Sequence, residues 1–437
     1  RWEWHMRSIS IFQVVLLASF GALAVAGVLI FAFAVGGNTG SSVGAVQIWG
    51  TLDQNAFATL LRAASENDAR LSQVSYVQKD TDTYIEELTQ ALASGAGPDL
   101  FVLRQDSAVH EAPRIRAIPF DTLSDTQFKN TFADAALPFL SESGVLGLPF
   151  AVDPLVLYWN RDMLQSAGYA KAPAYWDELY ELARKVTKRT DSGTITKSAI
   201  SFGEYRNVNN AKDIVSMLIL QAGGTITTRD AAGRLIPALS PRTGEAGQAS
   251  ASALRFYTEF ADPSKEDYTW NRARAEAMKA FASGDLALYI GYASEQPLLS
   301  RMNPNLNYAI ASVPQIRNAA RTINGGRAYA FATPRTTKNP VGAVTVAYLL
   351  STAESSQALA QALGIPSARR DILNQPVTGY DELFNKQAII ARAWLDPDPK
   401  KTESIFQAMI ENTTSGTLLL TEAITRADQE MGQILGL

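Results

Sequence analysis

The stretch from Gly147 to Leu182 reads GLPFAVDPLVLYWNRDMLQSAGYAKAPAYWDELYEL and is the most informative part of this 437-residue chain. A Gly-x-Pro turn leads into a short apolar strand, LVLYWN, and Asp153 stands just before that strand. A short amphipathic helix follows and ends at Gly168, after which a Pro-containing spacer leads to a second helix that begins at Trp176. This order of turn, strand and helices is typical of an α/β protein.

The same stretch resembles the pattern GxPxxxxxxxLYYNxxxxxxAGxxxPPxTWxEL of family 1 extracellular solute-binding proteins, the sugar-binding receptors of ABC importers. Trp159 replaces the second Tyr of that pattern, and Ala174-Tyr175 replaces its Pro-x-Thr. The resemblance extends over roughly 46–365. It implies a two-lobed, periplasmic-binding-protein-like α/β fold (type II) with a ligand cleft between the lobes. It also implies capture of a small solute, a sugar or polyol, and delivery to ABC transporter permease subunits.

A regular alternation of predicted strands and helices precedes that stretch. Apolar runs alternate with amphipathic segments, and the pattern predicts strands and helices at 46–49, 54–66, 74–77, 81–94 and 98–103. Two successive βαβ units indicate a parallel, doubly wound sheet. Ligands bind beyond the carboxyl ends of such strands, so the loop 50–53 and the turn 104–106 are candidate site segments.

The composition excludes several classes of protein. The chain carries a net charge of −4 and no basic block, so we expect no nucleic-acid partner. It has no cysteine, which excludes disulfides and thiol chemistry. His5 and His110 are its only histidines, too few for a multi-histidine metal site, so we expect neither a metal nor a cofactor. A monomer is expected.

The N-terminal segment 9–35 contains no charged residue. As a helix it would reach about 40 Å, compared with about 30 Å for a hydrocarbon core. Arg7 precedes it and no Lys or Arg follows before Arg62, so the positive-inside rule places the large domain outside the cytoplasm. We therefore expect one transmembrane anchor at the cell membrane; the alternative is secretion after cleavage at Ala32-Phe33-Ala34.

We expect the remaining chain to form a linker and two lobes of discontinuous segments. The small-residue segment 36–45 is the linker. The expected boundaries are 46–152 with 293–332 for lobe 1, and 153–292 with 333–437 for lobe 2.

Sugar recognition requires aromatic faces against the ring and polar side chains that meet the hydroxyl groups. The aromatic candidates are Trp49, Tyr205, Trp270, Tyr292 and Trp394. The polar candidates are Asp53, Asp106, Asp153 and Arg327, and Gly325 and Gly326 would allow close approach of backbone N–H groups. Each aromatic residue has an alternative role in core packing, and Asp53 has one as a helix N-cap.

No catalytic residues are assigned. The sequence lacks a Gly-x-Ser-x-Gly elbow, a His-Glu-x-x-His motif and a phosphate-binding loop. Two alternatives to a solute receptor remain open at this point. A secreted carbohydrate-active hydrolase would use a pair of carboxylates. A surface sensing or adhesion protein would reuse the fold.

Overall fold

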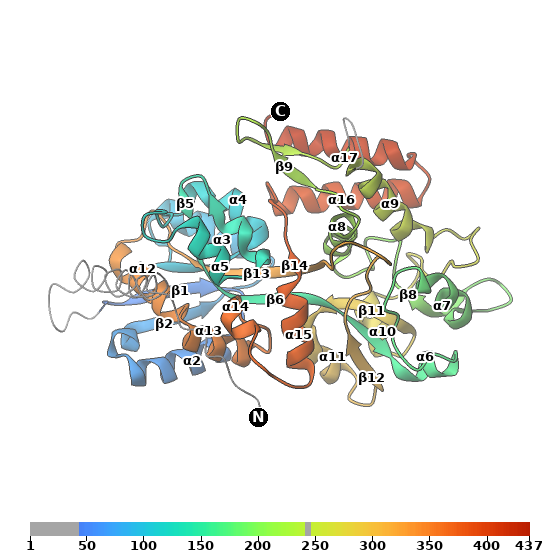
Figure 1. Ribbon diagram of the computed structural model, residues 1–437, viewed down its shortest axis with the longest axis horizontal. Helices are drawn as coiled ribbons and strands as arrows, with labels where there is room; N and C mark the ends of the chain where they lie inside the picture. Colours follow the sequence, from blue (N-terminus) through green and yellow to red (C-terminus); the bar gives the residue numbers. More distant parts are fainter. Residues whose placement is uncertain (1–42, 241–245) are drawn as a thin grey trace, which may run out of the picture.

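The computed structural model describes residues 43–240 and 246–437, which form two α/β lobes joined by strands that run through both (Figure 1). Each lobe has its own hydrophobic core, and each core draws on segments that are far apart in the chain. The N-terminal segments 9–35 and 36–42, where the anchor and most of the linker are expected, lie outside the described residues.

Lobe 1 is built on parallel strands, as the sequence predicts. Strand β1 pairs in parallel with β2 on one side and with β3 on the other. Helices α2 and α3 connect these strands, and α2 buries Phe57, Leu60 and Leu61 on one face. The bounds are β1 Val46–Gly50, α2 Gln54–Asn67, β2 Val74–Gln78, α3 Tyr84–Ser94, β3 Leu100–Arg104, η2 Gln105–Ser107, α4 Ala108–Glu111, α5 Asp125–Thr131 and η4 Asp134–Phe139.

Strand β6, Leu148–Asn160, crosses from lobe 1 into lobe 2. Its first half pairs with β13, Asn324–Ala332, and its second half pairs with β11, Leu286–Tyr292. The exchange of partners occurs between Pro154 and Leu155. The sequence predicted only a short strand after a Gly-x-Pro turn. The observed strand begins at Leu148 because the pairing with β13 extends past both prolines, even though a proline gives no N–H to a ladder.

Lobe 2 surrounds the second half of β6. Helix α8, Ala211–Gln221, is buried over most of its length between the sheet and the C-terminal helices (Figure 1). The other bounds are α6 Arg161–Ser166, α7 Glu178–Val186, β7 Lys188–Arg189, β8 Ile195–Ile200, β9 Thr227–Arg229, β10 Leu235–Pro237, α9 Ala246–Glu259, α10 Ala277–Ala282, α11 Gln296–Met302, β12 Tyr308–Ala311, α16 Pro399–Thr414 and α17 Leu420–Ile434.

The chain after β11, from residue 293 on, divides between the lobes differently from the expected boundaries. Leu299 and Val313, expected in lobe 1, pack in the core of lobe 2. Val346 and Leu359, expected in lobe 2, pack in the core of lobe 1. The reason is that β12 pairs with the lobe-2 half of β6, whereas α13 packs on α2. The bounds here are α12 Pro340–Leu350, α13 Ala353–Leu363, α14 Arg370–Leu373, α15 Tyr380–Ile389 and β14 Ala391–Arg392.

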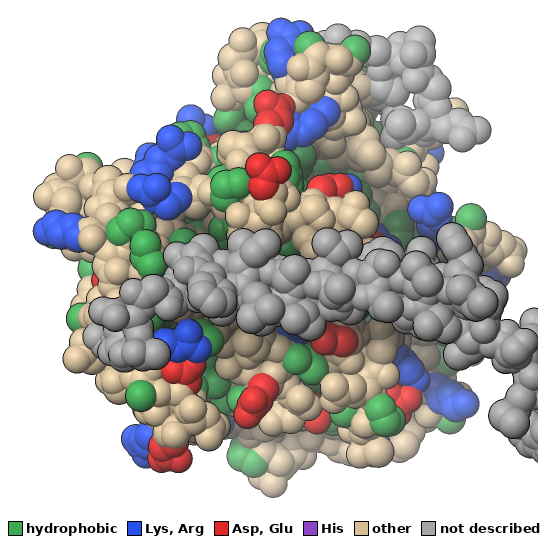
Figure 2. Space-filling model, turned by 60° about the vertical axis from the view of Figure 1, so that its left-hand side comes forward, with side chains coloured by type: hydrophobic (Ala, Val, Ile, Leu, Met, Phe, Trp, Pro, Cys, Tyr) green, Lys and Arg blue, Asp and Glu red, His purple; other side chains and the backbone are tan. Residues whose placement is uncertain are grey.

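The surface of the described chain is mixed in charge. On the face shown in Figure 2, basic and acidic side chains are interspersed wherever grey atoms do not cover them. None of the helices within residues 43–240 and 246–437 is both long enough and apolar enough to span a bilayer.

Replacement of Gly326 by alanine should destabilise the protein. A Cβ atom at this position of β13 would lie 2.9 Å from the Cβ atom of Ala391 in β14. Overpacking of this kind costs about 1–3 kcal/mol. Urea unfolding of Gly326→Ala measures the loss. The matched control is Gly432→Ala in α17, where the nearest atoms lie 3.8 Å away and alanine favours the helix by about 1 kcal/mol. Equal stability of the two variants would contradict the packing argument.

Candidate functional site

A narrow cavity of about 30 Å³ lies between the lobes, at the carboxyl ends of β3 and β11. Lobe 1 contributes η2, lobe 2 contributes α8 and the segment after β14, and β13 forms part of the wall. The lining residues are Gln105, Asp106, Lys212, Asp213, Ser216, Met217, Leu220, Tyr292, Gly325, Gly326, Arg392, Ala393, Trp394 and Asp396. A larger cavity lies within α13–α15, and Asp381 is the one charged residue that lines it within the described part of the chain, whereas the cavity between the lobes gathers charged groups from both of them.

Each carboxylate that lines the cavity is in an ion pair with a cation. Asp106 accepts a hydrogen bond from the Nε atom of Arg104 at 2.7 Å, and the Nη2–Oδ2 distance of this ion pair is 2.6 Å. Asp213 is 2.8 Å from the Nη2 atom of Arg327. Asp396 is 2.6 Å from the Nζ atom of Lys212. The cavity therefore carries many charged groups, and each of these carboxylates is neutralised locally.

The cations of the wall are compensated in the same way. Arg392 extends from β14 to Asp134 of lobe 1, with an Nη2–Oδ2 distance of 2.8 Å. Burial raises the pKa of the Asp106 carboxyl, but the Arg104 guanidinium, together with Lys212 and Arg327, outweighs burial and holds this pKa at about 2. The pKa of Lys212 is raised, because attraction to Asp396 and Asp106 outweighs the effect of burial. Asp106 and Lys212 are therefore both charged at neutral pH.

Two aromatic side chains line the cavity in different ways. The Trp394 ring is half-buried and packs on Phe406, with ring centroids 6.1 Å apart. The Tyr292 ring is buried, and the Arg327 guanidinium lies 4.0 Å from its centroid. One face of Tyr292 is therefore occupied by a cation, whereas Trp394 offers the more accessible ring.

One polar group in the cavity wall has no partner. The Ser216 hydroxyl, on α8, is buried and makes no hydrogen bond within the described part of the chain. A buried hydroxyl that makes no hydrogen bond is costly, so this atom is suited to a hydrogen bond from a molecule in the cavity.

Two glycines of the wall serve packing. A Cβ atom on Gly325 would lie 2.9 Å from Leu155, and one on Gly326 would lie 2.9 Å from Ala391. The sequence suggested that these glycines admit a ligand to the backbone. The structure gives a different reason: β13 must approach its neighbours closely.

Of the eleven candidate site residues, five line the cavity: Asp106, Tyr292, Gly325, Gly326 and Trp394. Arg327 lies beside it, through its contacts with Asp213 and Tyr292. Whether these residues contact a ligand stays a prediction.

The other five candidates do not line the cavity. Trp270 is fully buried in the core of lobe 2 and donates to Asn207, which removes it from the residues able to stack on a ligand. Asp153 is buried and accepts a hydrogen bond from the Ser294 amide. The Trp49 ring lies 3.8 Å below the Lys79 ammonium, Asp53 caps α2, and Tyr205 bonds to Glu403.

Gln105 lies in the turn 104–106 that the sequence indicated, but sequence reasoning missed Lys212, Asp213, Ser216, Met217, Arg392 and Asp396. A signal for Lys212 does exist, since a lysine precedes an otherwise apolar helical run, IVSMLIL. Within residues 43–240 and 246–437, no group of three or more His, Asp or Glu side chains is arranged to hold a metal ion.

Comparison with known proteins gives one family match. The family model for bacterial extracellular solute-binding proteins matches residues 72–355. Putative binding proteins of Brucella abortus and Brucella suis are 23% identical over 247 residues, which is 56% of this chain and 56% of each relative. The alignment thus spans about half the length of these curated relatives.

Solved structures share the fold. A solute-binding protein of an ABC transporter from Thermotoga lettingae, bound with α-D-tagatose, has a TM-score of 0.66 at 22% identity, covering 90% of this chain and 100% of that chain. A maltose/maltodextrin-binding domain from Bdellovibrio bacteriovorus, bound to maltotriose, has a TM-score of 0.67 at 17% identity, with coverage of 90% and 100%. The sugar-binding protein MalE from Xanthomonas citri has a TM-score of 0.71 at 16% identity, with coverage of 90% and 97%.

The Asp153→Asn variant should gain stability relative to the wild type as the pH rises. Burial raises the pKa of Asp153 to about 7, compared with about 3.9 in an unfolded chain. The folded protein therefore keeps a proton that the unfolded chain releases. The wild-type protein loses stability between about pH 4 and pH 7, because the carboxyl group ionises in the unfolded chain but not in the folded protein. An asparagine side chain at this position stays neutral and still accepts a hydrogen bond from the Ser294 amide. The relative gain should reach at most about 4 kcal/mol at pH 8.

Urea unfolding at pH 4.5 and pH 8 measures this difference. The control is Asp121→Asn, an exposed position at which the pH dependence should match the wild type. A difference between Asp153→Asn and the wild type that is the same at both pH values would show that Asp153 is ionised in the folded protein.

Proposed function

The chain belongs to the bacterial extracellular solute-binding proteins, and we propose that it captures an uncharged sugar or polyol between its lobes and delivers it to an ABC importer. The observation that carries the proposal is the interlobe cavity, in which each lining carboxylate is paired with a cation. Sugar-bound relatives of the same fold agree with this ligand class.

Charge pairing favours a neutral ligand. An anion would have to compete with Asp106, Asp213 and Asp396 for the cations that they already hold. Sugar hydroxyl groups face no such competition, because paired carboxylates and guanidinium groups keep spare lone pairs and N–H groups. The Ser216 hydroxyl and the Trp394 ring add the polar and the apolar contact that a sugar ring requires.

The same pairing disfavours the hydrolase alternative. Glycoside hydrolysis needs a protonated carboxyl group as general acid. Asp106, with a pKa of about 2, cannot hold a proton at neutral pH. Burial raises the pKa of Asp396 to about 6, but this buried carboxyl group is occupied by Lys212 and Thr402, and Asp213 is held in an ion pair with Arg327.

Closure of the lobes around the ligand is expected to occur at the crossing strands β6 and β13, as hinge motion does in such receptors. Contacts across the cleft support a closed arrangement. Glu142 of lobe 1 lies 3.3 Å from Arg229 of lobe 2, and His110 lies 3.9 Å from Asp398.

A thermal-shift screen of the purified protein against neutral sugars, polyols and sugar phosphates tests the ligand class. A neutral ligand at about 100 times its dissociation constant should stabilise the protein by about 2.7 kcal/mol. Stabilisation by sugar phosphates alone would contradict the charge argument. Release of reducing sugar from a bound ligand would move the protein to the hydrolases.

Trp394→Ala should weaken the binding of the neutral ligand roughly 10- to 100-fold, because a stacking side chain loses about 1.5–3 kcal/mol of buried apolar contact. Trp49→Ala should leave the affinity within about twofold, since Trp49 does not line the cavity. Calorimetry measures both variants. The opposite order of effects would move the site to the end of β1.

We also propose that the segment 9–35 anchors the protein in the cell membrane with both lobes on the outer side. The family is described as extracellular, which agrees with this location. Membrane fractionation of the full chain should recover the protein in the membrane, and removal of residues 1–42 should release it. Soluble protein whose mature N-terminus lies near Val35 would instead establish cleavage after Ala34.

A further inference from the structure

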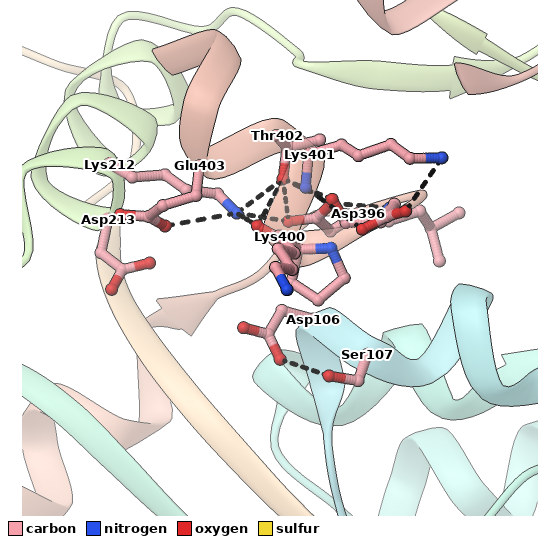
Figure 3. Close-up of polar contacts among 12 residues, drawn as sticks. Asp106, Ser107, Lys212, Asp213, Asp396, Lys400, Lys401, Thr402 and Glu403 are labelled. Carbon is pink, nitrogen blue, oxygen red and sulfur yellow. Dashed lines mark hydrogen bonds and ion pairs between the residues drawn. The ribbon is translucent and has the colours of Figure 1, made fainter. Parts of the chain in front are cut away.

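Lys212 forms an unusual buried cluster at the edge of the cavity (Figure 3). Its side chain, near the start of α8, is only 7% exposed, and that of its partner Asp396 is 1% exposed. The Nζ atom of Lys212 donates to Asp396 at 2.6 Å, to Thr402 at 2.7 Å and to the carbonyl oxygen of Pro399 at 3.4 Å. An ammonium group has three protons, so this cluster engages all of them.

The partners of Lys212 belong to one continuous segment that ends at the start of α16. Asp396 also accepts from the backbone N–H of Asp398 at 3.1 Å and from the Thr402 hydroxyl at 2.9 Å. The cluster therefore attaches residues 396–402 to α8, at a separation of 184 positions in the chain between Lys212 and Asp396.

Trp394 lies between two anchored residues. Two positions after it, Asp396 is held by Lys212; two positions before it, Arg392 is held by Asp134. The carbonyl oxygen of the intervening Leu395 accepts from Thr227 at 2.7 Å. The Lys212 ammonium lies 5.5 Å from the centroid of the Trp394 ring. The backbone on both sides of the ring is thus fixed by charged groups.

We propose that Lys212 is a positioning residue of the binding site, which holds the Trp394 ring in the cavity wall through Asp396 and Thr402. The proposal rests on the proposed function for the role of the cavity, but the position of the ring can be measured without a ligand. Lys212 has no free proton for a ligand, so its effect on binding is exerted through the segment that it anchors. A buried ion pair adds little net stability compared with apolar side chains, so a role in fixing one conformation is the stronger reason for its presence.

The ligand-free test uses the full chain labelled with 5-fluorotryptophan and ¹⁹F NMR. Trp394→Phe assigns the Trp394 resonance. Lys212→Met should shift or broaden that resonance while the resonance of the core residue Trp270 stays in place. Lys212→Arg, which keeps the charge, should leave the position and width of the Trp394 resonance close to those of the wild type. The matched control is Lys197→Met, which breaks the exposed Lys197–Asp285 pair and should change neither resonance.

Two further variants keep the test decisive if Lys212→Met does not fold. Thr402→Val removes one partner of Lys212 at similar volume. The double variant Lys212→Met/Asp396→Leu leaves no buried unpaired charge, because Glu403, the other carboxylate near Lys212, is exposed. Each should move the Trp394 resonance. An unchanged Trp394 resonance in a folded variant would overturn the proposal.

The affinity test uses maltotriose and D-tagatose as probes. Lys212→Met should weaken binding at least tenfold, and the double variant with Trp394→Ala should bind within twofold of Trp394→Ala alone. Additive losses would overturn the proposal, because they would show that Lys212 acts independently of the ring. If the Trp394 resonance moves but neither sugar binds, positioning is supported and the proposed ligand class fails. If a sugar binds and Lys212→Met changes neither resonance nor affinity, the proposed function stands and this inference fails.

Discussion

The pairing of strand β6 with partners in both lobes is the constraint on which the rest of the structure depends. Its first half is bound to β13 and its second half to β11, so a single strand belongs to two cores. Nearly all of its side chains are buried, so a slip of one residue would exchange the side chains that pack on its two faces and disrupt the packing on both. The register therefore fixes where the lobes meet, and it places Gly325, Gly326 and Tyr292 beside the cavity.

Local patterns were enough to predict lobe 1 up to β3. Helix α2 shows why: Phe57, Leu60 and Leu61 recur at helical spacing, and Asp53 caps the N-terminus. The extent of β6, and the way in which the residues after β11 divide between the two lobes, were not predictable in this way. They depend on pairing with β13 and β12, which lie more than a hundred positions away. Periodicity does not carry information about such partners.

The candidate site was predicted only in part, for the same physical reason. Tyr292 and Trp394 were predicted as aromatic side chains able to stack on a sugar ring, and both line the cavity. Trp270 has the same chemistry but lies in the core, because an aromatic residue in a sequence shows no sign of which surface it covers. Lys212 and Asp396 become meaningful only as a pair, and the fold alone brings them within 2.6 Å.

For the function that we propose, the paired charges of the cavity explain how one site combines polarity with selectivity for neutral molecules. An unpaired charge in a closing cleft would lose its hydration and would need an opposite charge from the ligand. Because Arg104, Lys212 and Arg327 each hold a carboxylate, closure does not require that compensation. The ligand then contributes only hydrogen bonds and an apolar face. In this proposed site, the energy for discrimination would come from leaving groups such as the Ser216 hydroxyl unpaired when the wrong molecule is enclosed.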